Sequence, residues 1–366
     1  MSTTVRHAVP GVGTVALVDA PDHHVRAVRA ALGPPAAARG ERDDLTVRFV
    51  DRLPAGPGLT RLGESAAYDD ERFYLVGDGG ALAAVDLARA GEPLEIVCER
   101  RLRRVPLLLS LLAVRLAATD RVLLHAASFR YRGRGVLVAG WQGGGKSETL
   151  LPFMAHGAEH LADEWTAVEP DGTMVGVRSD VQVWDWQLRQ LPALRAHLPL
   201  RARAPMRIAS MALDAAAGRH PGRLGRVVSL LRPGLEHHAR RSVAPDVLFG
   251  DRAGRGATAI DVALLAVVAD RPQTTVRPVA AADIAARMPG SLVHERRELL
   301  DAYAMYRFAF PDRSSAILEA GFEPERRVLA AALSHAETYA VEHPTPLALE
   351  ELFTAAAPVC APRRSG

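Results

Sequence analysis

The sequence predicts an α/β protein with more than one domain, on the basis of three observations. Short runs of β-branched and aliphatic residues alternate with stretches of helical length along most of the chain. One of these runs leads through a glycine-rich turn directly into the start of a helix, which is a strand–turn–helix order. The 366 residues are also enough for two or three domains, each with its own core.

Residues 1–104 are predicted to form an N-terminal α/β domain. Nothing in this region matches a recognisable catalytic or ligand-binding motif, so we interpret it as a packing or recognition domain. Asp22 is expected to cap its helix, and Gly33-Pro34-Pro35 to end it. The predicted elements are a helix at 22–31 and strands at 13–19, 45–51, 72–76 and 94–98.

Residues 105–366 are predicted to form the second domain. An apolar helix at 105–119 is too short to span a bilayer and contains Arg115. It leads into a strand at 121–129, and a turn at Gly133 returns the chain into the strand before the glycine-rich turn. The later predictions are strands at 165–168, 174–178, within 257–269 and at 337–342, and helices at 281–288, 291–320, 324–334 and 347–357.

Composition narrows the function classes. The hydrophobic content of 48%, the charged content of 24% and the net charge of +3 are ordinary for a globular protein and give little support for nucleic-acid binding. Cys98 and Cys360 have no metal or redox spacing, and residues 1–7 lack the apolar core of a signal peptide. We therefore expect a cytoplasmic protein that does not bind membranes.

The glycine-rich turn carries the strongest chemical signal. Residues 140–147 read Gly-Trp-Gln-Gly-Gly-Gly-Lys-Ser and fit G-x-x-x-x-G-K-[ST]. Glycines at 140, 143, 144 and 145 let backbone N–H groups point into one concavity, and the helix that follows directs its positive end to the same place. The motif predicts a phosphate-binding loop in which Lys146 reaches the β- and γ-phosphates and Ser147 holds magnesium.

Lysine usage supports this interpretation. Lys146 is the only lysine in the sequence, so 44 of the 45 basic residues are arginine. The planar guanidinium of arginine does not replace a compact ammonium group inside a tight phosphate loop. The exception at position 146 is therefore what a phosphate-binding function predicts.

Two adjacent carboxylates form a second candidate group. Asp163 and Glu164 end a short apolar segment soon after the helix that follows the loop. Phosphoryl transfer needs acids there, one to complete the magnesium shell and one to accept the proton of an attacking hydroxyl. Either Asp163 or Glu164 can take the metal role on these grounds.

An arginine-dense stretch covers residues 195–241. Prolines 205, 221 and 233 are expected to divide it into short helical pieces. The favoured interpretation is a solvated insertion or lid. The alternative is that the stretch binds an acidic peptide, a phosphorylated substrate or the nucleotide. The stretch has no aromatic residues on which bases could stack, which argues against RNA binding.

At this point the chain resembles a known family. The run from Gly140 to Thr149, with Glu148 after the Lys-Ser pair, is similar to the nucleotide loop of HPr kinase/phosphorylase and its relatives. Those proteins place a histidine on the strand before the loop and a pair of acids after the next helix, where this chain has His125 and Asp163-Glu164. The resemblance implies a C-terminal P-loop nucleotide-binding domain of the HPr-kinase and phosphoenolpyruvate-carboxykinase-like type.

The resemblance also implies an activity, namely an ATP- and Mg²⁺-dependent kinase that acts on a hydroxyl group. Asp163 would be the general base, Glu164 and Ser147 would serve the metal, and His125 would lie near the transferred phosphate. A histidine on an apolar strand is often a core residue, and that alternative stays open for His125. The relatives assemble as oligomers, so a homo-oligomer is compatible with the resemblance.

The chain also departs from the bifunctional HPr enzymes. They have two aspartates where this chain has Asp163 and Glu164, and their glutamate-arginine-glycine-rich signature is replaced by residues 178–186. The sequence is therefore closer to divergent kinase relatives that act on peptides or small hydroxyl compounds. Arg178, Arg240 and Arg241 are candidate substrate contacts.

Two alternatives to the kinase remain. In the first, the loop serves a nucleotide-binding switch or scaffold, and the N-terminal domain recruits a partner. Chemistry of the phosphoenolpyruvate-carboxykinase type is disfavoured, because those enzymes hold manganese with a lysine and a histidine, and this chain has no lysine besides Lys146.

Overall fold

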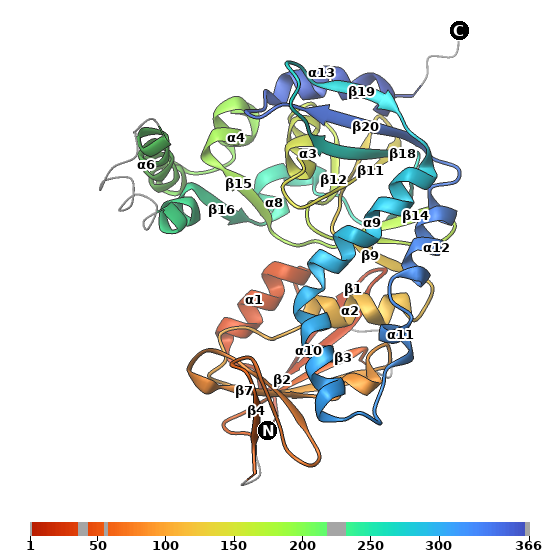
Figure 1. Cartoon of the computed structure of the whole chain (residues 1–366). Helices are drawn as coiled ribbons and strands as arrows, with labels where there is room; N and C mark the ends of the chain where they lie inside the picture. Colours follow the sequence, from red (N-terminus) through yellow and green to blue (C-terminus); the bar gives the residue numbers. More distant parts are fainter. Residues whose placement is uncertain (1, 36–42, 55–57, 218–231, 363–366) are drawn as a thin grey trace.

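The computed structural model describes residues 2–35, 43–54, 58–217 and 232–362. These residues fold into two lobes, one below the other in Figure 1. The N-terminal strands, drawn red to orange, lie in the lower lobe, and most of the later chain lies in the upper lobe. The protein is thus a mixed α/β protein, as predicted, with several sheets that include parallel strands.

Within the described ranges, the N-terminal lobe is built on an eight-stranded sheet of order β1-β2-β3-β8-β7-β6-β5-β4. The pairs β2/β3 and β3/β8 are parallel, and the other neighbours are antiparallel. The four predicted strands correspond to β2, β3, β6 and β8. The strands are β1 (Thr4–Val9), β2 (Gly13–Val18), β3 (Leu45–Val50), β4 (Thr60–Leu62), β5 (Ala66–Tyr68), β6 (Phe73–Val76), β7 (Leu82–Val85) and β8 (Leu94–Glu99).

Helix α1 (Asp22–Leu32) connects β2 to β3. Its buried residues His24, Val28 and Leu32 recur every four residues and therefore share one face. The helix ends at Gly33, whose φ of +88° is readily available only to glycine. The expected cap is wrong by one position, because Pro21 is the N-cap and Asp22 is the first helical residue, where its charge still favours the helix dipole.

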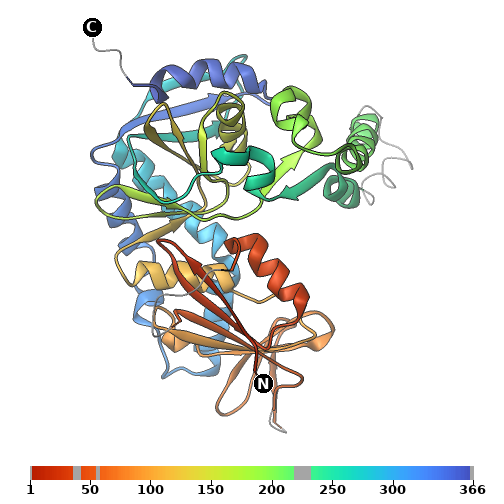
Figure 2. The same cartoon turned by 180° about the vertical axis from the view of Figure 1, so that it is seen from behind.

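The core of the N-terminal lobe extends beyond residue 104. It includes apolar side chains of α2 (Leu108–Ala117) and α10 (Arg297–Ala309). From α10, Tyr306 packs edge-on against Phe73 of β6 with ring centroids 5.5 Å apart. Figure 2 shows α1 and α2 at the end of this lobe that meets the C-terminal lobe.

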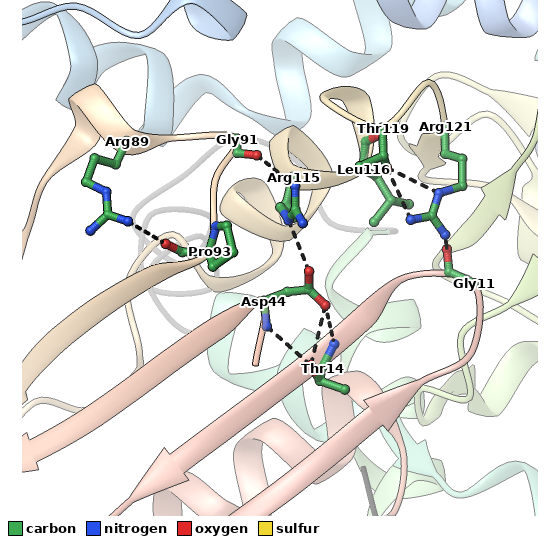
Figure 3. A network of polar contacts seen from close by, with 10 residues as sticks. All are labelled: Gly11, Thr14, Asp44, Arg89, Gly91, Pro93, Arg115, Leu116, Thr119 and Arg121. Atoms are coloured by element: carbon green, nitrogen blue, oxygen red, sulfur yellow. Dashed lines mark hydrogen bonds and ion pairs between the residues drawn. The ribbon is translucent and has the colours of Figure 1, made fainter. Parts of the chain in front are cut away.

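A polar network joins α2 to the sheet (Figure 3). Arg115 of α2 donates to Asp44 at 3.0 Å, and Asp44 accepts a second hydrogen bond from the backbone N–H of Thr14 at 2.9 Å. Arg121, beyond the end of α2, donates to the carbonyl of Gly11 at 3.0 Å. Both arginines therefore tie the chain after residue 104 to the turns that precede β2 and β3.

The C-terminal lobe contains a six-stranded sheet, in the part of the chain that the structure describes, of order β12-β10-β11-β18-β20-β19. Its central strands β11, β18 and β20 are parallel to one another. Strands β11 and β18 were anticipated from their aliphatic runs, and β20 from the alternation of its residues. The six strands are β10 (Ala127–Tyr131), β11 (Arg134–Gly140), β12 (Glu159–Ala162), β18 (Val262–Val268), β19 (Thr275–Pro278) and β20 (Glu337–His343).

Helices cover both faces of this sheet. Along β11, Val136 and Val138 belong to one apolar core, whereas Leu137 and Ala139 belong to another. The first core takes in α3 and α13, and the second takes in α9 and α12, so the central strands are buried on both sides. These helices are α3 (Lys146–Ala155), α9 (Ala281–Glu295), α12 (Glu323–Ala332) and α13 (Leu349–Cys360).

A four-stranded antiparallel sheet of order β17-β14-β13-β9 lies beside the large sheet. Two predicted strands divide between the sheets, 121–129 into β9 and β10 and 257–269 into β17 and β18. His125 lies in the bend where the chain passes from one sheet to the other, rather than within a strand. The strands are β9 (Val122–Leu124), β13 (Thr166–Val168), β14 (Thr173–Gly176) and β17 (Ala257–Ala259).

The arginine-dense region lies beside the upper lobe and partly outside the described residues, which omit 218–231 (Figure 1). Pro205 does not break the chain into short pieces, because α6 is one helix of 18 residues that contains it. Residues 232–239 are also helical. The elements here are β15 (Val181–Trp184), α4 (Asp185–Gln190), α5 (Pro192–Ala196), α6 (Leu200–Ala217), β16 (Arg240–Val243) and α8 (Pro245–Phe249).

Two helices run consecutively from the upper lobe to the lower one (Figure 1). The helix predicted at 281–288 continues to Glu295 as α9, and α10 follows directly. The segment predicted as helical at 291–320 also contains a short helix, α11 (Ala316–Glu319). None of the helices formed by the described residues has the length and apolarity needed to cross a membrane.

Candidate functional site

The glycine-rich loop, residues 140–147, connects the central strand β11 to α3. It leaves the sheet at the carboxyl end of β11, beside the end of the parallel strand β18. Gly145 is the N-cap of α3, and its carbonyl accepts a hydrogen bond from the Thr149 hydroxyl at 2.8 Å. The loop therefore meets the start of a helix at a sheet edge where ligands of open α/β sheets commonly bind.

Close packing explains why three of the four predicted glycines are required. A Cβ at Gly140 would lie 2.6 Å from the carbonyl oxygen of Ala266, and a Cβ at Gly144 would lie 2.9 Å from the carbonyl oxygen of Trp141. At Gly145 a Cβ would overlap Nε2 of His343, and φ is +98°. Gly143 has open space around it, so its φ of +72° is the only requirement for glycine there.

The ammonium group of Lys146 lies against the loop backbone. Nζ donates to the carbonyl of Trp141 at 3.0 Å and contacts that of Gly140 at 3.4 Å. The residue is only 5% exposed. The only lysine of the chain is therefore held against the backbone of its own loop.

The charges of four carboxylates act on this ammonium group. Burial lowers the pKa of Lys146, while the charges of Glu295, Glu164, Asp163 and Glu148 act in the opposite direction. Glu295 has the largest of these opposing effects. The charge of the buried cation is thus opposed by several acids.

The predicted acids follow β12 directly, in the bend after Ala162. Asp163 is 1% exposed, and neither of its oxygens has a hydrogen-bond partner among the described residues. Burial raises the pKa of Asp163 to about 7, and Glu164 adds to this effect. The nearby Ser147 hydroxyl acts in the opposite direction, although it is not placed to hydrogen-bond in this structure.

His125 is held between two carboxylates. Its Nε2 lies 2.9 Å from Oε2 of Glu164, and its Nδ1 lies 2.5 Å from Oε1 of Glu295. Its ring stacks on that of Trp165, with centroids 5.2 Å apart. Burial alone would lower the pKa of His125, but the bonds to the two carboxylates outweigh it, and the pKa is raised. His125 is therefore part of the charged cluster and not an apolar core residue.

Glu295 is the site residue that sequence reasoning missed. It is the last residue of α9, and its carboxylate bonds to a histidine 170 positions earlier in the chain. Although burial opposes ionisation, the hydrogen bond from His125 and the charges of His125 and Lys146 lower the pKa of Glu295. No local motif marks a lone glutamate at a helix end, so the signal arises only from the folded chain.

Glu148 and the candidate arginines lie outside the cluster formed around His125. Glu148 accepts a hydrogen bond from Gln187 of α4 at 3.0 Å. Arg178 pairs with Asp246 at 2.5 Å, and the guanidinium of Arg240 lies 5.6 Å from the centre of the Trp184 ring. Arg241 is exposed on β16, opposite Val183.

Cavities adjoin the glycine-rich loop on two sides. One of about 520 Å³ lies between the loop, the end of β18 and α9, and Trp141, which is 55% exposed, lines it. Another of about 600 Å³ is lined by Gly143, Glu148, Trp184 and Trp186. The loop is therefore accessible to a ligand larger than a phosphate ion.

The described residues contain no group of three or more His, Cys, Asp or Glu side chains arranged to hold a metal ion. No protein-family model matches the chain, and no curated protein matches it.

Proposed function

We propose that this protein is an ATP- and Mg²⁺-dependent phosphotransferase with an alcohol group as acceptor. The observation that carries the proposal is Asp163, a buried acid without a hydrogen-bond partner in the described residues and with a pKa near 7. It lies close enough to Lys146 for their charges to interact. A proton acceptor and a phosphate-binding cation are the two groups that such a transfer requires.

In this proposal, residues 140–147 are a phosphate-binding loop. Their backbone N–H groups and the N-terminus of α3 would bind the β- and γ-phosphates. The Lys146 ammonium, which now donates to loop carbonyls, would donate to phosphate oxygens instead. These donors act mainly by balancing the charge that spreads over the transferred group.

Asp163 would act as general base. With a pKa near 7, a substantial fraction of its carboxyl groups is ionised at neutral pH. The carboxylate takes the proton of the acceptor hydroxyl, and the hydroxyl oxygen forms a bond to the γ-phosphorus. The bond from that phosphorus to the bridging oxygen breaks, and the products are ADP and a phosphate monoester.

His125 would contribute positive charge. Both of its ring nitrogens face carboxylate oxygens, which can only accept hydrogen bonds when ionised, so both nitrogens must donate and the ring is an imidazolium. Its charge, like that of Lys146, opposes the negative charge of a bound polyphosphate. The family resemblance implies that His125 lies near the transferred phosphate.

The residues present fit a magnesium ion bound together with nucleotide. Asp163 offers two oxygens without partners in the described chain, beside Ser147, and Glu164 has a second carboxylate oxygen besides the one bonded to His125. Mg²⁺ is usually held by one or two carboxylates plus phosphates and water, so no cluster of three side chains is needed. When bound, the ion would neutralise charge on the phosphates.

Lys146→Ala and Asp163→Asn separate the two roles. Lys146→Ala should weaken ATP binding and abolish turnover, whereas Asp163→Asn should keep nucleotide affinity and lose transfer. Binding is measured by titration calorimetry, and transfer with ATP labelled in the γ-phosphate against serine peptides and small alcohols. Unchanged ATP turnover by Lys146→Ala would refute the proposal.

The same assay addresses the nucleotide-switch alternative. Under that alternative, ATP binds with Lys146-dependent affinity but no acceptor is phosphorylated and no phosphate is released. The Asp163→Asn protein would then be indistinguishable from the parent in both measurements.

A further inference from the structure

The cavity of about 600 Å³ beside the glycine-rich loop has no part in the phosphoryl transfer itself. It lies between the loop, the first turn of α3, the turn from β15 into α4, helix α6 and the helical residues 232–239. Strand β15 and α4 lie on the side of the upper lobe that carries α6 (Figure 1). The cavity has the size of a small-molecule site, roughly 300–1000 Å³.

The position of Lys146 indicates the direction of a bound triphosphate. In loops of this kind the lysine reaches the β- and γ-phosphates. Here its Nζ lies at the carbonyls of Gly140 and Trp141, which line the cavity of about 520 Å³. We therefore expect the γ-phosphate on that side of the loop. The nucleoside then extends past Gly143, which borders both cavities, toward Glu148, which lines the cavity of about 600 Å³.

Hydrogen bonds hold residues 184–186 beside the loop helix. Glu148, in the first turn of α3, accepts a hydrogen bond from the side-chain amide of Gln187 at 3.0 Å. The amide oxygen of Gln187 accepts one from the backbone N–H of Trp184 at 2.9 Å. Gln187 is 1% exposed, so this link is shielded from water. The start of α4 is thereby fixed to the helix that follows the loop.

Two tryptophans in this segment offer stacking surfaces. Trp184 and Trp186 both line the cavity and are half-buried. Aromatic side chains bind the flat rings of nucleobases by stacking. The guanidinium of Arg240 already lies over the Trp184 ring, 5.6 Å from its centre. Trp186 has no ring or cation contact of this kind among the described residues, so it is the more open surface of the two.

Asp185, between the tryptophans, supplies a hydrogen-bond acceptor. It lines the cavity and is 6% exposed, and its Oδ2 accepts no hydrogen bond from the described part of the chain. Its ion pair with Nε of Arg189 is long, at 3.4 Å. A buried acceptor without a donor is costly, and an ionised carboxylate can only accept. Asp185 therefore favours a ligand that brings an N–H group to this point.

The charge of the lining also distinguishes the two ends of a nucleotide. Among the described residues, the lining has four carboxylates and one guanidinium, so its charge is negative. This charge disfavours a phosphate group inside the cavity and favours an uncharged base with an amino group. The charged residues are Glu148, Asp185, Asp214, Glu236 and Arg232.

From this geometry we propose that the cavity binds the nucleoside of ATP. The adenine ring stacks on Trp186, with Trp184 as the neighbouring wall, and the 6-amino group donates a hydrogen bond to Asp185. The triphosphate runs from the cavity over the loop to Lys146. This inference rests on the proposed function and assigns the residues that select its nucleotide.

Titration calorimetry on the full-length protein with Mg²⁺ tests the assignment by comparing ATP, ITP and inorganic triphosphate. Triphosphate contacts the loop alone, so the ratio of its dissociation constant to that of ATP measures what the nucleoside adds. We expect ATP to bind about tenfold or more tightly than triphosphate because of stacking. ITP has a carbonyl oxygen in place of the 6-amino group and should bind about tenfold or more weakly than ATP.

Two variants, each with a control, locate the effect. Trp186→Leu should lower the triphosphate-to-ATP ratio about fivefold or more, while its unchanged affinity for triphosphate shows that the loop is intact. Phe308→Leu, which removes an exposed ring from α10, should keep the parent ratio. Asp185→Asn preserves the shape but can also donate, so it should erase or reverse the preference for ATP over ITP. Asp301→Asn, at an exposed position of α10, should keep that preference.

The outcomes separate this assignment from the proposed function. Equal affinities for ATP and triphosphate in the parent, or a ratio that Trp186→Leu leaves unchanged, would overturn the nucleoside site even if Lys146-dependent kinase activity is found. A preference for ATP over ITP that survives in Asp185→Asn would overturn the contact with the amino group. ATP turnover that does not depend on Lys146 would instead refute the proposed function, and Trp186-dependent ATP binding would still support the site.

Discussion

Replacing Asp163 by asparagine should make the protein more resistant to unfolding at alkaline pH. Burial raises the pKa of Asp163 from 3.8 to about 7, so the folded state holds this proton more tightly than the unfolded state. The resulting stability is complete below pH 3.8 and is lost as pH rises through 7. Asparagine has a similar shape and no charge, so the variant does not lose stability in this way as pH rises.

The size of the effect follows from the pKa change. One pKa unit corresponds to about 1.36 kcal/mol, so ionising Asp163 reduces the free energy of unfolding by roughly 4 kcal/mol between about pH 4 and pH 8. Parent and variant should therefore have similar free energies of unfolding near pH 4. The difference should grow with pH and level off above about pH 7.

Urea unfolding at a series of pH values, followed by circular dichroism, measures this difference directly. Asp301→Asn, at an exposed position of α10, controls for the loss of one negative charge and should show little change. A difference between parent and Asp163→Asn that stays constant within about 1 kcal/mol across the range would refute the reasoning, because it would mean that Asp163 is not destabilised by ionisation.

Three further predictions concern other contacts. Gly145→Ala should lower the melting temperature, because the new Cβ meets His343 and the φ of +98° is strained, at a cost of about 1–3 kcal/mol; a melting temperature equal to the parent's would contradict this. Arg115→Ala should lower the free energy of unfolding by about 1.5–3 kcal/mol, because it removes a charged hydrogen bond to the half-buried Asp44. Arg48→Ala, which removes one partner of an exposed ion pair, should lower it by about 1 kcal/mol or less in the same urea titration. Glu295→Gln should lower the pKa of His125 in an NMR titration, since a carboxylate that favours the imidazolium is lost; a pKa that stays or rises would show that Glu295 does not hold the ring.

The sequence was most informative where the relevant residues are consecutive. The loop from Gly140 to Ser147 was identified because its chemistry depends on the backbone of one short segment. Asp163 was predicted from its position after the loop helix, and its charge acts on Lys146 in the folded chain. Glu295 escaped notice because only the folding of α9 against the sheets brings it to His125.

Secondary structure was predicted well for the aliphatic runs of β11 and β18 and for the alternating residues of β20. An error arose at 121–129, where one apolar run serves two sheets, because periodicity does not reveal a change of sheet. Pro205 was expected to end a helix. Instead α6 contains it as its sixth residue and continues to Ala217.

The placement of α10 has a consequence for how the chain is made. The first lobe's interior is not complete until Tyr303 and Tyr306, some two hundred residues later, have left the ribosome. During synthesis, part of the apolar surface of the early strands therefore stays exposed to solvent until α10 has been made. In a fragment that ends near residue 104, that surface would remain exposed permanently. We therefore expect the fragment to aggregate when it is expressed separately.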